Sequence, residues 1–425
     1  MSGKRGPLVP LSSLAEVNPS THTNGLGPSD YASFVPMSDV SEHGTWLRRQ
    51  VRRIRDVSSG FTSFADGDVL FAKITPCMEN GKGCHATNLM NGVGFGSTEF
   101  HVLRARSHAH GRFIFHWTQS PALRKRAEAF MTGSAGQQRV QTQFFDRFRV
   151  LSLSVLEQQR IAEILDTLDE AIRGTERVIA KLQQLNRGLL HDLLTRGIDD
   201  SGELRDPDRH PEQFKDSPLG RIPTEWVVMS IGATCDAVVD CPHSTPEYLD
   251  DGVLVARTMH VRDGQYDEDA SSRVSERQFR ERIARLEPKA GDVIFTREAP
   301  VGEAFCVPAG MRICLGQRVM LLRPSPRRLS GVYLVSQVYS GAVKKRISQL
   351  TGGTTNPHLN VGDVRDFLIP LPPYAEQERL ASLMSAFDGR LAQERTTAVK
   401  VRALKRGLMH DLLTGRVRTL SGDSC

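Results

Sequence analysis

EQQRIAEILDTLDEAIRGTERVIAKLQQLNRGLLHDLLT, residues 157–195, recurs as EQERLASLMSAFDGRLAQERTTAVKVRALKRGLMHDLLT, residues 376–414. An offset of 219 residues aligns the two stretches without a gap, and 15 of the 39 positions are identical. The same offset pairs Thr132 with Thr351 and Phe148 with Phe367, while Gly67–Phe71 matches Gly291–Phe295 at an offset of 224. The chain therefore consists of two copies of one unit, each with about 150 variable residues followed by about 40 similar ones.

The similar stretches have the apolar spacing of paired helices. Steps of four and three residues select Ile161, Leu165, Leu168, Ile172, Thr175, Ile179, Leu182, Asn186, Leu189 and Leu193, and in the second copy Leu380, Met384, Phe387, Leu391, Glu394, Ala398, Val401, Lys405, Leu408 and Leu412. Such a narrow stripe is typical of a coiled-coil seam, and the two long helices are expected to form an antiparallel coiled coil. Both copies interrupt it at the same two places, 175/394 and 186/405. We expect one helix to pack on the other; the alternative is two amphipathic helices buried in separate cores.

The variable parts have strand and turn signals, so each is expected to be an α+β globule. The predicted strands are Ser33–Val35, Val69–Phe71, Phe100–Leu103, Val253–Val255, Val293–Phe295 and Val319–Leu322, and one helix is predicted near 110–131 and one near 329–350. Polar, proline-bearing residues between the halves indicate a linker, and Trp226 is expected to anchor the second half. The expected pseudo-two-fold order is a globule (1–155), a helix (156–198), the linker (199–223), a globule (224–373), a helix (374–416) and a tail (417–425).

Charge and cysteine usage narrow the class of protein. The net charge is +6 and the isoelectric point is near 9.0, which suits a polyanionic partner. Arginine is clustered in Arg48–Arg55, and smaller basic clusters occur at Arg124–Arg126 and Lys344–Arg346. Seven cysteines without a CxxC pair, no secretory apolar segment and no long apolar run predict a cytoplasmic protein without a membrane span. Cys235, Cys241 and His243 are close in sequence but do not have zinc-ligand spacing, so no metal is expected.

The motifs that an enzyme of nucleic-acid metabolism needs are not found. An amino-methyltransferase loop requires Asn or Asp before Pro-Pro-aromatic, whereas Leu371 precedes Pro372-Pro373-Tyr374. The glycine-rich Gly92–Gly96 is interpreted as a turn, and no phosphate-binding GxxxxGK[ST] motif occurs. Asp208, Glu212 and Lys215 lie in the linker with the wrong spacing for a nuclease, and the repeated His191-Asp192 favours a helix-end or partner contact. No catalytic residue and no bound cofactor are predicted.

Several strings, in their order along the duplicated chain, resemble specificity subunits of type I restriction–modification systems. These strings are Gly67–Ile74 in the first half, Ser217–Trp226 at the start of the second half, Thr296–Glu303 within it, and Ile369–Gln377 entering the second helix. The first helix entry, Val150–Val155, departs from the pattern because it lacks the proline pair. The resemblance covers nearly the whole chain and implies two target-recognition domains joined by two long helices.

What the resemblance implies is a reader of double-stranded DNA without chemistry of its own. Each domain would read half of a split target, and the chain would hold two methyltransferase subunits, which bring S-adenosylmethionine, and restriction-motor subunits. A 39-residue helix is roughly 58 Å long, and half-sites on one face of DNA lie about 34–36 Å apart or at multiples of that distance, so paired helices can act as a spacer. Low similarity between the halves predicts different half-sites.

Lys, Arg and His side chains are the DNA contacts expected from residue chemistry. The predicted contacts are Arg48, Arg49, Arg52, Arg53, Lys73 and Lys82 in the first domain, and Arg257, His260, Arg297 and Arg318 in the second, with Thr354, Thr355, Asn356 and His358 as further candidates. Two other functions remain as alternatives. One is a self-contained DNA methyltransferase or nuclease with degenerate motifs, and the other is a coiled-coil protein that bridges DNA without sequence preference.

Overall fold

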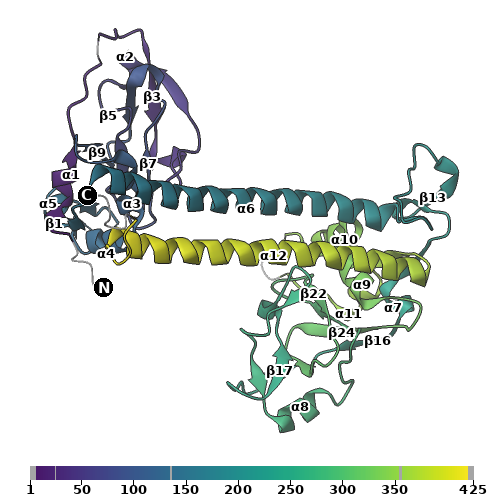
Figure 1. The fold of residues 1–425 in the computed structure, drawn as a ribbon. Coiled ribbons are helices and arrows are strands. Elements are labelled where there is room, and N and C mark those ends of the chain that lie inside the picture. The colour runs from purple at the N-terminus through teal and green to yellow at the C-terminus, as the bar shows by residue number, and fades with distance from the viewer. Residues whose placement is uncertain (1–5, 24, 135, 354–356, 420–425) are drawn as a thin grey trace. The chain divides into compact units, whose positions relative to one another are not determined.

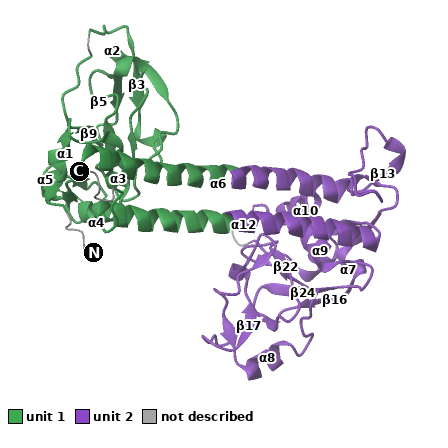
Figure 2. Cartoon of the chain, in the orientation of Figure 1, with its two compact units in different colours: residues 1–177, 395–425 green, residues 178–394 purple. Residues whose placement is uncertain are grey.

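The computed structural model describes residues 6–23, 25–134, 136–353 and 357–419. The chain divides into two compact units: unit 1 comprises residues 1–177 and 395–425, and unit 2 comprises residues 178–394 (Figure 2). Two long helices contribute to both units: α6 (Val155–Thr195) and α12 (Tyr374–Leu413). None of the helices in the described ranges is both long and apolar enough to cross a membrane.

Unit 1 contains a lobe of two four-stranded sheets (Figure 1). One has the order β2-β9-β6-β7, and the other the order β4-β3-β8-β5 with β3 and β8 parallel. The strands are β1 (Leu8–Pro10), β2 (Ala15–Val17), β3 (Tyr31–Val35), β4 (Gln50–Arg53), β5 (Thr62–Ala65), β6 (Val69–Ala72), β7 (Gly83–His85), β8 (Val93–Gly96), β9 (Phe100–Ala105), β10 (Met131–Thr132), β11 (Arg139–Val140) and β12 (Arg149–Leu151); the short helices are α1 (Leu11–Leu14), α2 (Ile54–Val57), α3 (Gly111–Gln119), α4 (Pro121–Glu128) and α5 (Phe144–Arg147). Strands β1 and β12 pair beside the start of α6.

Unit 2 repeats this plan with a smaller second sheet. Its sheets have the orders β16-β24-β21-β22 and β20-β17-β23, and β15 pairs with β25 as β1 does with β12. The strands are β13 (Phe214–Ser217), β14 (Gly220–Pro223), β15 (Val227–Ser230), β16 (Cys235–Asp240), β17 (Val253–Ala256), β18 (Val261–Arg262), β19 (Gln265–Tyr266), β20 (Arg273–Val274), β21 (Val293–Thr296), β22 (Ala304–Cys306), β23 (Ile313–Leu315), β24 (Val319–Pro324) and β25 (Leu368–Leu371); the helices are α7 (Ile231–Thr234), α8 (Glu276–Arg282), α9 (Gly331–Val338), α10 (Gly341–Thr351) and α11 (Val361–Arg365). The six predicted strands are thus confirmed as β3, β6, β9, β17, β21 and β24.

Each lobe packs against the start of one long helix and the end of the other. In unit 1, Ile161 and Leu165 of α6 join the lobe core together with Met409 and Leu412 of α12. In unit 2 the corresponding core holds Leu380 and Met384 of α12 with Leu193 and Leu194 of α6. This burial is what attaches each lobe, because apolar area removed from water stabilises the contact by about 25 cal/mol per Å².

Within each unit the two helix segments run antiparallel. In unit 1, Asp169 pairs with Lys405 and Glu176 with Arg402, so the partner number falls as the α6 number rises. In unit 2, Asn186 Nδ2 donates to Asp388 Oδ1 at 3.3 Å. All twenty predicted seam positions are buried or half-buried. The packing of one helix segment on the other is therefore favoured over helices in separate cores.

Two expectations about local structure were incomplete. The single helix expected near 110–131 is α3 followed by α4, because Pro121 has no N–H to continue α3 and Ser120 caps α4 by accepting from Leu123 N. Likewise the helix expected near 329–350 is α9 followed by α10, separated at Ser340, whose backbone is extended. Both lobes therefore close with two short helices instead of one.

The segment expected to be a linker, 199–223, contains ordered structure. Strands β13 and β14 form a hairpin, and Ile198 bridges to Leu204. Arg205 Nη1 then lies 2.6 Å from Glu376 Oε1 at the start of α12. Trp226, which the sequence singles out as an anchor, is fully buried and its Nε1 donates to Glu376 Oε2 at 3.1 Å. This segment is tied to unit 2 by specific contacts.

Candidate nucleic-acid interface

The arginine cluster of unit 1 lies on an exposed sheet edge. Strand β4 is the edge strand of its sheet and pairs only with β3 among the described strands, in the register Arg53↔Tyr31 and Arg52↔Ala32. Val51, Arg52 and Arg53 are exposed there. We call Arg48, Arg49, Arg52 and Arg53 the arginine strip. An exposed β-ribbon edge of this kind is narrow enough to enter the major groove of DNA.

Three of these guanidinium groups lie over aromatic rings. The Cζ atom of Arg52 is 4.0 Å from the ring centroid of Phe34, that of Arg49 is 4.3 Å from the Trp46 ring, and that of Arg53 is 5.8 Å from the Tyr31 ring. A cation–π contact orients the guanidinium but leaves its net charge in place. The arrangement therefore keeps positive charge at the surface in a restricted set of orientations.

The members of the strip are not equally available. Arg48 Nε lies 3.4 Å from Asp39 Oδ2. Burial alone would raise the pKa of Asp39, but hydrogen bonds from Gln50 and Arg48 and the charge of Arg48 hold this pKa below its ordinary value. Arg49 Nη1 donates to the carbonyl oxygen of Thr87 at 2.7 Å. Arg52 and Arg53 therefore keep the charge that is most accessible to a phosphate or base edge.

The two lysines expected beside the strip belong to the other sheet of the lobe. Lys73 follows β6, where its charge helps Arg139 to lower the pKa of Glu99. Lys82 precedes β7, and its Nζ donates to the carbonyl oxygen of Met37 at 3.3 Å. Both side chains are half-buried. Because both lysines are half-buried and Lys82 has an intramolecular partner, they are weaker candidates for phosphate contacts than the exposed Arg52 and Arg53.

Unit 2 has a smaller arrangement of the same type. The Arg257 guanidinium lies 4.4 Å from the Tyr248 ring centroid, and its Nη1 donates to Ser272 Oγ at 3.1 Å. Arg257 follows β17, which, like β3 in unit 1, pairs with one parallel and one antiparallel strand. Both lobes thus have an arginine stacked on an aromatic ring, on the edge strand β4 in unit 1 and directly after the central strand β17 in unit 2.

A second basic group in unit 2 surrounds a carboxylate. Arg318 is exposed, and its Nε lies 3.0 Å from Glu298 Oε2, while His358 Nδ1 lies 3.4 Å from Glu298 Oε1. One glutamate thus serves two candidate DNA contacts. Thr354, Thr355 and Asn356, which the sequence analysis placed with them, lie outside the described residues.

Two predicted contacts are corrected by their burial. Arg297 is 5% exposed, with Nη2 at 2.9 Å from Asp240 Oδ1 and Nη1 donating to the Leu359 carbonyl oxygen at 3.1 Å. His260 is also 5% exposed, and burial lowers its pKa. Both side chains serve the interior of unit 2, so neither is placed to meet a phosphate. Sequence position next to a strand end could not distinguish them from Arg257, which is only half-buried.

Residues that the sequence analysis missed are the aromatic supports of the arginines. Tyr31, Phe34 and Trp46 precede the arginine strip in the sequence, and Tyr248 precedes Arg257. The available signal was an aromatic pair three residues apart, of which only Phe34 lies on the predicted strand, followed further along by a cluster of arginines. Its meaning depends on the register of β3 with β4, which the sequence does not state.

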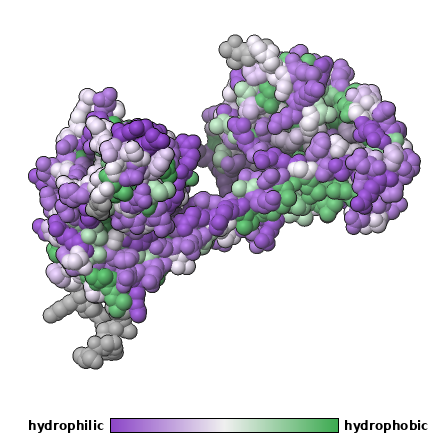
Figure 3. All heavy atoms as spheres, turned by 90° about the horizontal axis from the view of Figure 1, so that it is seen from above, coloured by the Kyte–Doolittle hydropathy of each residue, from purple (hydrophilic) through white to green (hydrophobic). Residues whose placement is uncertain are grey.

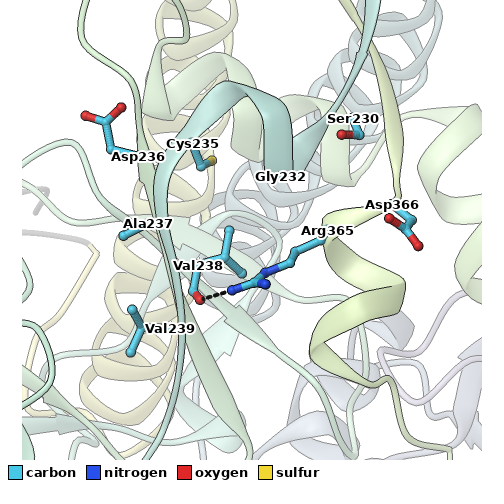
Figure 4. A pocket seen from close by; sticks show the side chains of 9 residues that line it. All are labelled: Ser230, Gly232, Cys235, Asp236, Ala237, Val238, Val239, Arg365 and Asp366. Atoms are coloured by element: carbon cyan, nitrogen blue, oxygen red, sulfur yellow. Dashed lines mark hydrogen bonds between the residues drawn. The ribbon is translucent and has the colours of Figure 1, made fainter.

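Two other groups of residues, a cavity lining in unit 2 and a cluster of titratable side chains in unit 1, lie apart from these basic surfaces. A cavity of about 480 Å³ beside α7 is lined by Ser230, Gly232, Cys235, Asp236, Ala237, Val238, Val239, Arg365 and Asp366 (Figure 4). Arg365 Nη2 donates to the Val238 carbonyl oxygen at 3.1 Å, and the two carboxylates point away from each other, so the lining converges on no shared ligand (Figure 4). Burial raises the pKa of the Cys235 thiol to about 12, which disfavours the nucleophilic thiolate.

The second grouping is His116, Asp166 and Asp169, whose ligand atoms lie within 4.8 Å of one another. Arg112 Nη2 is 2.7 Å from Asp166 Oδ1, and Lys405 pairs with Asp169. Burial alone would raise the pKa of Asp166, but hydrogen bonds from His116 and Arg112 and the charge of Arg112 hold it well below its ordinary value. The carboxylates already have protein cations, so this cluster joins α3, α6 and α12 and does not form an open metal centre.

The fold and these sites define a class: a duplicated α+β protein in which two long helices carry two lobes with arginine–aromatic surfaces. The family model described as "Type I restriction modification DNA specificity domain" matches residues 53–184 and 263–401, which is more than half of the chain. The chain belongs to this family.

Individual relatives agree with that assignment. The chain is similar to the type I restriction enzyme EcoAI specificity subunit of Escherichia coli, at 34% identity over 189 residues, which is 43% of this chain and 32% of that protein. It is also similar to the EcoEI specificity subunit of Escherichia coli, at 38% identity over 155 residues, 36% of this chain and 26% of that protein. The matches thus span about a third or less of these two relatives.

The fold is also found in solved structures. A chain from a study of complex assembly and conformational transition of the type I R-M system aligns with a TM-score of 0.57 at 20% identity, over 98% of this chain and 99% of that chain. At this identity the likeness concerns the fold. It supports the duplicated α+β architecture that the internal repeat predicts.

Proposed function

We propose that this chain is the DNA-specificity subunit of a type I restriction–modification complex. In this proposal each lobe reads one half of a split target in double-stranded DNA. The observation that carries the proposal is that each lobe has an arginine stacked on an aromatic ring, Arg52 on Phe34 and Arg257 on Tyr248. Arginine is the side chain that most often reads guanine edges in the major groove and also binds phosphates.

The two half-sites differ in this proposal, since the two surfaces do. Unit 1 has two arginine–aromatic pairs on its four-residue edge strand β4 and a third, at Arg49, just before it, whereas the edge strand β20 of the corresponding sheet has two residues. The long helices would set the length of the spacer between the halves. A non-palindromic, interrupted target is the expected result.

The proposed protein partners are two identical methyltransferase subunits, and restriction-motor subunits that join the complex. A repeated helix surface supports the first part: Arg187, Gly188 and His191 are exposed on α6, and Arg406, Gly407 and His410 are exposed at the equivalent places of α12. A Cβ atom at either glycine would meet nothing within 4 Å. Glycine costs about 1 kcal/mol in a helix, so its repetition at an open position favours close approach by another molecule.

Apolar surface on the helical part of unit 2 is a second support for a protein partner. Figure 3 shows apolar residues gathered there, and Val178 and Leu185 of α6 are 44% and 47% exposed. Contiguous exposed apolar side chains are typical of interaction sites. In this proposal the partners carry out methyl transfer from S-adenosylmethionine, and this chain has no catalytic residue. A protein that acts on cellular DNA would be located in the cytoplasm.

Sequence selection from random duplexes tests the proposal. The full chain with its methyltransferase partner is expected to enrich a bipartite sequence with a constant spacer, and that duplex is expected to compete for binding far better than random duplex. Retention of all sequences equally would instead favour the DNA-bridging alternative. Methyl transfer from labelled S-adenosylmethionine by the pure chain alone would favour the self-contained enzyme.

A further inference from the structure

A cavity in unit 1 has a lining unlike that of the proposed DNA-reading surface. It encloses about 340 Å³ between α4, α5 and β12, and is lined by Ala122, Arg126, Phe130, Phe144, Arg147, Phe148 and Arg149. The helices α4 and α5 lie at one end of unit 1, and α2 and β3, which flank the arginine strip, lie at the other (Figure 1). The cavity is therefore separate from the arginine strip.

The floor of the cavity is aromatic and firmly packed. Phe144 is 1% exposed, and its ring centroid lies 5.9 Å from that of Phe130 and 5.6 Å from that of Phe148. Phe148 also packs edge-on against Trp117, with 5.6 Å between ring centroids. Phe130 and Phe148 are only half-buried, so they offer ring surface to a ligand.

The rim of the cavity is positive. The Cζ atoms of Arg126 and Arg147 lie 5.3 Å and 5.8 Å from the same Phe130 ring centroid, and Arg149 projects from β12. All three arginines are exposed, and no ion pair joins any of them to another described residue. No carboxylate lines the cavity. Like charges gathered in this way repel one another, and a bound anion would relieve the repulsion.

The repeat shows that the fold does not require this chemistry. The offset of 219 residues places Asp363 at the position of Phe144, Asp366 at that of Arg147 and Leu368 at that of Arg149. Unit 2 has the same local plan, with α11 and β25 in place of α5 and β12, and it keeps Phe367 at the position of Phe148 and Lys345 at that of Arg126. Phe144, Arg147 and Arg149 have no aromatic or basic counterpart there, so the complete lining occurs in unit 1.

We propose that this cavity binds a nucleotide. The three guanidinium groups would hold its phosphate through charge-assisted hydrogen bonds, and its base would stack on the exposed rings of Phe130 and Phe148. A volume of about 340 Å³ is within the range of small-molecule sites, which begins at roughly 300 Å³. The nucleotide has two possible sources, a free nucleotide or one unit of a single strand. The inference does not depend on the reading of duplex DNA.

Calorimetric titration of the full chain with AMP tests the proposal, with adenosine and inorganic phosphate as separate probes. AMP is expected to bind at least about tenfold more tightly than either fragment, because each supplies only one half of the contacts. Equal affinity for phosphate and AMP would overturn the role of the rings, and equal affinity for adenosine and AMP would overturn the role of the arginines. A short oligo-dA strand as a fourth probe distinguishes the two sources.

Variants of exposed residues locate the site. The double variant Arg126→Gln/Arg147→Gln and the single variant Phe130→Leu are each expected to weaken AMP binding about tenfold. Arg221→Gln is the matched control, because Arg221 is also an exposed arginine over a phenylalanine ring, Phe214 at 5.8 Å, but lines neither this cavity nor the one beside α7. Unchanged AMP binding in the double variant, or the same loss in the control, overturns the proposal. If the double variant unfolds, Arg149→Gln serves in its place. Binding of the selected duplex is measured in parallel, so failure of this site and failure of the proposed function are distinguishable.

Discussion

Units 1 and 2 attach their lobes to the long helices with the same two side chains but complete the attachment differently. Gln158 and Gln377 make matching contacts: each accepts from a backbone N–H, of His110 or Ser330, and donates to two carbonyl oxygens. The preceding glutamates have diverged. Glu376 accepts from Arg205, Trp226 and Ile198 N, whereas Glu157 pairs with Arg418, which is 44% exposed. The repeated glutamate thus lies at the same position in both units, but its contribution to the free energy of unfolding depends on its neighbours.

The largest expected effect separates these two glutamates. Glu376→Ala should lower the free energy of unfolding by about 3–5 kcal/mol, because it removes the close carboxylate partner of the largely buried Arg205 guanidinium and the acceptor of Trp226 Nε1. Glu157→Ala should cost only about 1 kcal/mol, since Arg418 can turn to water. Urea unfolding followed by tryptophan fluorescence measures both. Equal losses would show that the two attachments are energetically equivalent.

Acidification is expected to destabilise unit 1 before unit 2. In unit 1, burial lowers the pKa of His85 and of His101 to about 4, and it also lowers the pKa of His116. Among the described residues of unit 2, His260 alone is a buried histidine whose pKa is lowered. In the unfolded chain these histidines take up protons near pH 6.5, whereas in the folded chain they do so only at lower pH. Their contribution to the free energy of unfolding is therefore fully present above pH 6.5 and falls as the pH drops from about 6.5 to 4.

The expected slope is up to about 1.4 kcal/mol per pH unit for each histidine. Hydrogen exchange of peptides from each unit, corrected for the intrinsic effect of pH, measures it between pH 7 and 5. Earlier opening of unit 2 would contradict the expectation. His101→Asn in unit 1 should flatten the pH dependence of that unit and leave unit 2 unchanged.

DNA reading should divide between the lobes. Arg52→Ala and Arg257→Ala are each expected to weaken binding of the selected duplex by about 1–3 kcal/mol, and each should relax preference in only one half-site. Arg48→Ala, whose charge is already paired with Asp39, is the control and should have a smaller effect. Binding at several salt concentrations is the measurement, and the two variants should reduce the salt slope by about one. Loss of preference in both halves from one variant would contradict the division.

The smallest effect concerns the polar seam position at 186/405. Lys405 pairs with Asp169 in unit 1, and the equivalent Asn186 donates to Asp388 in unit 2. Lys405→Asn should therefore cost about 1 kcal/mol, because it exchanges a half-buried ion pair for the hydrogen bond seen in unit 2, while Asn186→Lys should change stability by less than about 0.5 kcal/mol. Thermal unfolding of both variants at the same protein concentration measures these changes in stability. A larger loss from Asn186→Lys would reverse the ranking.

Prediction from sequence succeeded where the signal is local and repeated. The six strands, the seam of the long helices and the anchoring role of Trp226 follow from periodicity, from duplication and from one large side chain beside a turn. The single-helix expectation near 110–131 failed at Pro121, although proline at a first helical turn is itself a sequence signal. The candidate DNA contacts differ in burial: Arg52 is exposed and Arg257 is half-buried, while Arg297 and His260 are interior.

By itself the sequence determined that the protein is duplicated, that each long helix has one apolar stripe, and that positive charge is concentrated in and around β4, because each of these features depends on residues close together in the chain. Only the tertiary structure decided which charges are available and what surrounds them. Arg48 pairs with Asp39, and Arg205 pairs with Glu376, which lies 171 residues further along the chain. Phe130 and Arg149 line the same cavity. The physical reason is that burial and pairing depend on which distant strands and helices pack together, and those neighbours determine whether an arginine serves the interior or the surface.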